Sequence, residues 1–209
     1  MDQNWTIVIS VDKDFSGYKK RNFYLTNFLL GFLWMLFHFT VVFFFTFQLK
    51  SVVLVGIFLW IGNLVAFLVD IPVWILQKYF KSKTLYTFGA FFQLLAMGIF
   101  TLFIFQATDF ITQNASWDSK IINGLVNFIF WDLLALTLLL IAAISYGLAK
   151  EINDVTTLSY IMNNVPPTSY SEIMARSGIF SGIGMLFWLI SSGTIMTLNP
   201  KLIVFTLLL

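Results

Sequence analysis

The sequence predicts an all-α fold, a polytopic membrane helical bundle with five full transmembrane helices and the start of a sixth. Of its 209 residues, 59% are hydrophobic and only 11% are charged, whereas an ordinary soluble domain carries roughly 25% charged residues. A globule of this size cannot bury so much Phe, Leu and Ile beneath a polar surface. In addition, five long stretches each hold at most one charged residue, and a helix needs roughly 20 apolar residues to cross the hydrocarbon core.

The first three expected spans lie close together in the chain. Residues 23–47 contain no Asp, Glu, Lys or Arg, and residues 52–76 follow after a connection of only four residues, Gln48 to Ser51. So short a connection predicts that these two helices are antiparallel neighbours. The third span, residues 85–105, follows a basic connection.

The fourth and fifth spans are separated by a longer polar stretch. The fourth covers residues 125–148 and the fifth residues 178–198. Between them, Pro166 and Pro167 interrupt a run rich in Asn, Thr and Ser, and a helix cannot continue through both prolines. We therefore expect a cytoplasmic loop made of two short pieces joined by a bend.

A sixth apolar run begins near residue 202 and stops after eight residues. A helix end left in mid-hydrocarbon has unpaired carbonyl groups that no water can reach. We therefore expect this chain to be a fragment, with the C-terminal half of the same protein as its missing partner.

The basic residues predict the orientation, because cytoplasmic connections carry an excess of Lys and Arg. With the N-terminus inside, three basic residues lie outside, namely Lys50, Lys120 and Lys201. Nine lie inside: Lys13, Lys19, Lys20, Arg21, Lys78, Lys81, Lys83, Lys150 and Arg176. We therefore expect residues 1–20 to form a cytoplasmic segment and residues 21–209 a transmembrane domain in the plasma or inner membrane.

The composition excludes several function classes. A net charge of +2 is too small to indicate a nucleic-acid partner. With no cysteine and one histidine, the chain offers no thiolate and no His-based metal centre. It carries no Gly-rich phosphate loop, His-Glu-x-x-His motif or G-x-S-x-G motif. We therefore expect that the chain is not an enzyme and that it binds no cofactor or metal. The first expected partner is the lipid bilayer.

Two ionisable residues fall at membrane depth in the expected spans. Such groups are costly there and tend to face a cavity or a partner. Asp132 and His38 lie at similar depth by the 1.5 Å rise per residue, so we expect them to share a polar cavity and to interact directly. Desolvation would favour the protonated carboxyl, which suits a proton carrier. Alternatively, Asp132 sits at the outer interface with access to water, and His38 bonds a neighbouring backbone carbonyl.

Other polar and small residues in the spans suggest packing or a binding site. Asn63, Gln93 and Asn127 could line a cavity, or form interhelical hydrogen bonds worth roughly 1 kcal/mol each. Gly178 and Gly182, spaced by four, would let two helices approach closely, with a hinge as the alternative.

The stretch "DIPVWILQKYFKSK" combines a carboxylate, a proline and a basic cluster. Asp70 lies eight residues before Lys78, about 12 Å along a straight helix, and Pro72 should kink the helix between them. One interpretation is a gate near the cytoplasmic mouth. The other is a kinked helix end whose carboxylate reaches toward the interface.

The same stretch resembles the end of helix two and the following loop of major facilitator superfamily transporters. The acidic-Ile-Pro start matches Asp70, Ile71 and Pro72, and basic residues stand at Lys78, Lys81 and Lys83. The loop aspartate and glycine of the family are both missing, and Gln77 and Phe80 are nearest to their places. A weaker resemblance places Asp154 at the family's helix-four exit and Arg176 at the lead-in to helix five.

The resemblance implies the N-terminal half of a transporter made of two six-helix halves, with helices one and four, and so His38 and Asp132, lining a central cavity. It implies a secondary active transporter that moves a small solute by alternating access, with proton coupling through Asp132. The alternative is a non-transporting membrane protein of the same fold, with a scaffold or assembly role, which the altered loop favours.

Overall fold

The computed structural model describes residues 17–48, 51–113 and 132–198, and within these ranges it contains helices and no strand. By length and composition, five helices can cross a membrane, which confirms the predicted all-α bundle. They are α1 (Gly17–Phe43), α2 (Val52–Leu76), α3 (Ser82–Gln113), α5 (Leu133–Asn164) and α6 (Tyr170–Leu198). A π-helical turn, η1 (Phe44–Gln48), extends α1, and a 3₁₀ turn, η2 (Pro167–Ser169), precedes α6.

Helix α5 corrects the expected loop between the fourth and fifth spans. It begins at Leu133 and continues to Asn164, so most of the polar stretch after residue 150 is helical. The helix continues because small and aliphatic residues extend its buried face at helical spacing: Ile152, Val155, Thr156, Ser159 and Ile161. The bend at the prolines is confirmed, since Val165 and Pro166 have extended backbones. Residues 125–131 and the expected sixth span from residue 202 lie outside the described residues.

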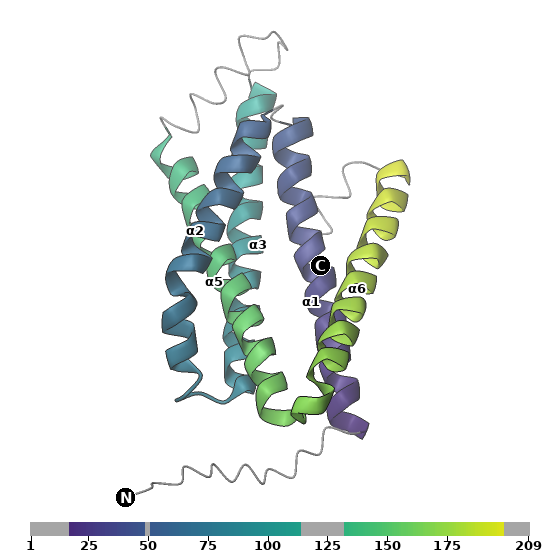
Figure 1. The fold of residues 1–209 in the computed structure, drawn as a ribbon. Helices are drawn as coiled ribbons and strands as arrows, with labels where there is room; N and C mark the ends of the chain where they lie inside the picture. The colour runs from purple at the N-terminus through teal and green to yellow at the C-terminus, as the bar shows by residue number, and fades with distance from the viewer. Residues whose placement is uncertain (1–16, 49–50, 114–131, 199–209) are drawn as a thin grey trace, which may run out of the picture.

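The helices form two groups that face each other (Figure 1). Helix α5 packs along both α2 and α3, and α1 packs along α6. Helices α1 and α2 run antiparallel, as expected, and touch through the rings of Phe37 and Phe58, whose centroids are 6.0 Å apart. The start of α1, the connection from α2 to α3 and the connection from α5 to α6 all lie at one end of the bundle. We call this the basic end, because exposed Lys78, Lys81 and Lys83 lie there.

A cluster of phenylalanines closes the half of the bundle away from the basic end. Five rings are less than 2% exposed: Phe37, Phe45, Phe58, Phe100 and Phe103. Phe100 is at their centre, with ring centroids 5.5 Å from Phe58 and 5.7 Å from both Phe37 and Phe45. The rings come from α1, η1, α2 and α3, so the cluster joins the two groups of helices.

Close helix contacts are made at glycines other than the predicted pair. A Cβ atom at Gly178 or Gly182 would meet nothing within 4 Å, so the expected packing contact of these two residues is not formed among the described residues. Instead, Gly184 of α6 lies against the backbone of Phe28 in α1, and Gly31 of α1 lies against the backbone of Ser181. Spacing alone does not tell which face of α6 meets a neighbour.

Candidate binding cavity

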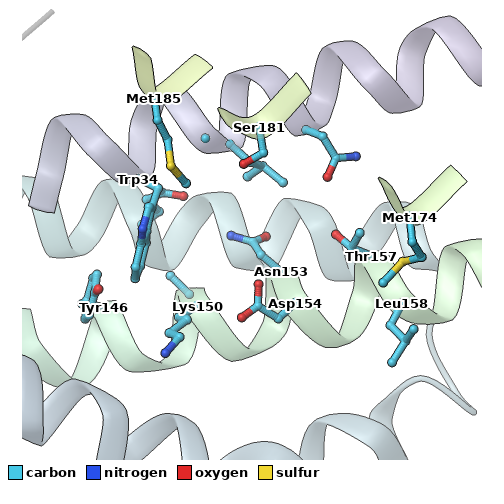
Figure 2. Close-up of a pocket in the computed structure, with 15 residues that line it drawn as sticks. Trp34, Tyr146, Lys150, Asn153, Asp154, Thr157, Leu158, Met174, Ser181 and Met185 are labelled. Atoms are coloured by element: carbon cyan, nitrogen blue, oxygen red, sulfur yellow. The ribbon is translucent and has the colours of Figure 1, made fainter. Parts of the chain in front are cut away.

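A cavity of about 500 Å³ lies between α1, α3, α5 and α6 (Figure 2). Ligand sites in proteins commonly measure about 300–1,000 Å³. The polar residues that line it are Asn27, Gln93, Lys150, Asn153, Asp154, Thr157 and Ser181. Most lining residues of α1, α3 and α6 come from the parts of these helices nearer the basic end. The cavity therefore lies on the basic-end side of the phenylalanine cluster and meets it at Tyr146, whose ring contacts Phe37 and Phe58.

Helix α5 supplies most of the polar wall. Tyr146, Lys150, Asn153 and Thr157 follow one another at steps of three and four, and Asp154 follows Lys150 by four, which places them on one side of a helix. Sequence reasoning missed this stripe, because it assigned residues after 150 to a loop. The signal was nevertheless present in the helical spacing of the polar residues.

The two charged residues of the stripe have different environments. The ammonium of Lys150 donates a 2.8 Å hydrogen bond to Oδ1 of Asn63 on α2, and in Figure 2 it points away from Trp34 and Ser181. The carboxylate of Asp154 has no hydrogen bond or ion pair among the described residues. Lys150 is therefore bonded toward α2. Its charge still attracts the Asp154 carboxylate, but the two form no salt bridge among the described residues, and Asp154 faces the cavity.

Two aromatic rings form another part of the wall. The indole of Trp34 stacks on the ring of Tyr146, with centroids 4.8 Å apart and planes at 14°, and both residues line the cavity. The imidazole of His38 lies beside the indole of Trp34, with ring centroids 5.8 Å apart. Its Nδ1 atom is buried and has no hydrogen-bond partner among the described residues.

Asp132 differs from its expected placement inside a span. It is the N-cap of α5, where its Oδ1 accepts hydrogen bonds from the backbone N–H groups of Leu134 at 2.9 Å and Ala135 at 3.2 Å. Its Oδ2 accepts a 3.2 Å bond from Gln106 on α3. The predicted direct bond to His38 is absent among the described residues, and neither residue lines the cavity. An aspartate at a helix start is explained by capping, because it satisfies N–H groups that have no partner within the helix.

We expect Asp132→Ala to lower the free energy of unfolding by about 0.5–2 kcal/mol, since the capping bonds are lost. Asp132→Asn should keep most of that stability, because an amide oxygen also caps helices. Unfolding of the two variants in mixed micelles checks this expectation. Equal stability of the Ala and Asn variants would contradict the capping role. Proton carriage by Asp132 stays a prediction, and uptake unchanged in Asp132→Asn would remove it.

The remaining predicted polar residues separate into two groups. Of the two roles left open, Gln93 is buried and lines the cavity, whereas Asn63 forms an interhelical hydrogen bond to Lys150. Asn127 lies outside the described residues.

The predicted gating residues lie in or beside helices. Helix α2 continues through Pro72 to Leu76, and the half-buried carboxyl of Asp70 lies close to that of Glu151 on α5. Asp154 is part of α5 and not of a loop. Arg176 lies on the exposed surface of α6, where it pairs with Glu172 at 2.7 Å.

Comparisons with known proteins identify no relative. No family model, curated protein or solved structure gives a significant match to this chain. The resemblance to the major facilitator superfamily therefore stays a prediction. A function for this chain has to be inferred from the chemistry of its own cavity.

Proposed function

We propose that this chain is part of a secondary active transporter that moves a small solute across a cell membrane by alternating access. The observation that carries the proposal is the cavity between α1, α3, α5 and α6, whose wall carries polar and charged side chains. Polar and charged groups inside a membrane bundle are costly, and they commonly mark a solute pathway. In transporters built on helix repeats the substrate site lies between helices inside the membrane.

The positions of the phenylalanine cluster and the cavity along the bundle support an inward-facing state. The phenylalanine cluster fills the bundle at the end away from the basic end, and the cavity lies on the basic-end side of it. If the basic end faces the cytoplasm, as the excess of Lys and Arg favours, the N-terminus is cytoplasmic and the solute site is reached from the cytoplasm. Movement of the α1–α6 pair against α2, α3 and α5 would then open the other side.

The expected orientation can be tested with single cysteines, because the chain has none of its own. We expect a membrane-impermeant thiol reagent added outside intact cells to modify Lys120→Cys but not Lys81→Cys. In inverted vesicles the pattern should reverse. Modification of both positions from the same side would contradict the predicted topology.

Transport is tested by solute uptake into liposomes that contain the complete protein, with and without a pH gradient. We expect uptake of at least one member of a broad solute panel, and we expect Met174→Trp to reduce it at least tenfold by filling the cavity. The matched control is Ile179→Trp on the same helix, a 60% exposed side chain that does not line the cavity. Absence of uptake across the panel would favour the scaffold or assembly role and contradict the proposal.

A further inference from the structure

The charges and rings of the cavity allow its ligand class to be named. We infer that the cavity binds a small organic cation, an ammonium group carried on an apolar body with a flat ring. The inference rests on the proposed function, because it takes the same cavity as the solute site. Three features carry it: the unpaired Asp154 carboxylate, the restrained Lys150 ammonium and the Trp34–Tyr146 pair.

The sign of the charge in the cavity favours a cation. Asp154 is four residues after Lys150 on the same helix, a spacing at which opposite charges can pair, yet no salt bridge joins them among the described residues. The 2.8 Å bond from Lys150 to Asn63 explains this, since it holds the ammonium toward α2. Asp154 is exposed on the cavity wall, and a carboxylate without a salt bridge attracts a cation more strongly where little water screens it.

Neighbouring charges add to this preference. The carboxyl groups of Asp70 and Glu151 lie close together where α2 packs on α5. Neither residue lines the cavity, and two carboxyl groups that share a hydrogen bond also share a proton. Together with Asp154 they nevertheless outnumber Lys150 in this part of the bundle, which disfavours an anionic ligand.

The aromatic wall favours an organic cation over a hydrated inorganic ion. Tryptophan is the best of the aromatic side chains at attracting a cation to its ring face. Tyr146 covers one face of the Trp34 indole, and the indole still lines the cavity. Met174 and Met185 add flexible apolar surface opposite α5, which suits the apolar body of the ligand.

The ligand class is tested by binding to the complete protein in lipid nanodiscs. The probes are 2-phenylethylammonium, the neutral 2-phenylethanol and the anionic phenylacetate, which share a ring and differ in charge. We expect the cation to bind at least tenfold more tightly than either of the others, measured by calorimetry. Equal affinity for the three probes, preference for the anion, or no saturable binding of the cation up to millimolar concentration would overturn the inference.

Asp154→Asn keeps the size of the side chain and removes its charge. We expect this variant to bind 2-phenylethylammonium at least tenfold more weakly, with binding of 2-phenylethanol unchanged. The control is Glu172→Gln, a carboxylate on α6 that pairs with Arg176 outside the cavity, and its affinity should equal that of the unmodified protein. Unchanged cation affinity in Asp154→Asn, with an unaltered unfolding temperature, would overturn the role of Asp154.

Asn63 provides a second test that leaves the cavity wall intact. In Asn63→Ala the Lys150 ammonium loses its acceptor and can turn toward Asp154, so we expect cation affinity to fall about fivefold or more. In Asn63→Asp the acceptor remains, and cation affinity should be kept. Equal affinity of both variants and the unmodified protein would contradict the restraint of Lys150.

Uptake measurements separate this inference from transport itself. Liposomes that take up only neutral or anionic solutes, with no competition from 2-phenylethylammonium, would overturn the ligand class and leave transport standing. Charge-selective binding that Asp154→Asn abolishes, without uptake of any solute, would support the ligand class and overturn transport.

Discussion

Replacing Gly184 by valine should force α1 and α6 apart and destabilise the bundle. A Cβ atom at this position would collide with the backbone carbonyl oxygen of Phe28 and stand 3.0 Å from the backbone nitrogen of Phe32. Backbone atoms in the middle of a helix cannot move aside as the end of a flexible side chain can. We therefore expect a loss of about 1–3 kcal/mol or more in the free energy of unfolding, as overpacking of a close contact typically causes. Unfolding by increasing SDS in mixed micelles measures it.

Gly178→Val on the same helix is the matched control. Both substitutions place the same β-branched residue in α6, so their effects on helix propensity are similar. Only Gly184 has a neighbour, because a Cβ atom at Gly178 would meet nothing within 4 Å. If both variants lose the same stability, helix propensity explains the result and the close contact of α1 with α6 is refuted.

The number of membrane helices could be predicted from the sequence because each apolar run is long and nearly free of charge. Their pairing could not, because apolar side chains suit both the lipid-facing and the protein-facing sides of such a helix. Gly178 and Gly182 illustrate the difference. Their spacing is typical of a close helix contact, yet Gly184 makes the contact in α6.

The candidate site was predicted less well, for a related reason. Residues 150–164 are polar enough to indicate a loop, although Thr156 and Ser159 are buried in helix contacts. Ending the span at residue 148 left Asp154 outside it, and the expected site included Asp132 instead, which is an N-cap. Gln93 could be singled out because it is an amide in the middle of an otherwise apolar run, but the sequence left open whether it lines a cavity or bonds another helix.

The cavity also depends on residues that are distant in the sequence. Trp34 and Tyr146 stack across more than a hundred positions, and Asn63 reaches Lys150 across 87 positions. No local pattern predicts either contact. A charged side chain in a membrane helix indicates that a partner is needed, but only the packing of α2 on α5 shows that Lys150 uses Asn63 and leaves Asp154 to the cavity.

Truncation of Phe100 should have the second large effect, because this ring joins the two groups of helices. It is fully buried and contacts the rings of Phe37, Phe45 and Phe58. In a water-soluble core, Phe→Ala costs about 3–5 kcal/mol. Part of that cost is transfer of the ring to water, which does not occur when the separated helices remain in lipid. The cost of losing the ring contacts remains. We therefore expect Phe100→Ala to lower the free energy of unfolding by on the order of 2 kcal/mol.

Phe91→Ala is the control for Phe100→Ala, since Phe91 lies on the same helix and is 56% exposed on the outer surface. A ring on the outer surface contacts lipid in both the folded and the unfolded state. Its removal should therefore change the free energy of unfolding by less than about 0.5 kcal/mol. The comparison is made by unfolding in mixed micelles, followed by uptake at a temperature where both variants are folded. A loss at Phe91 as large as that at Phe100 would mean that Phe91 is covered by protein in the membrane. If the phenylalanine cluster is also the closed side of the transporter, Phe100→Ala should in addition increase solute leak, whereas Phe91→Ala should not.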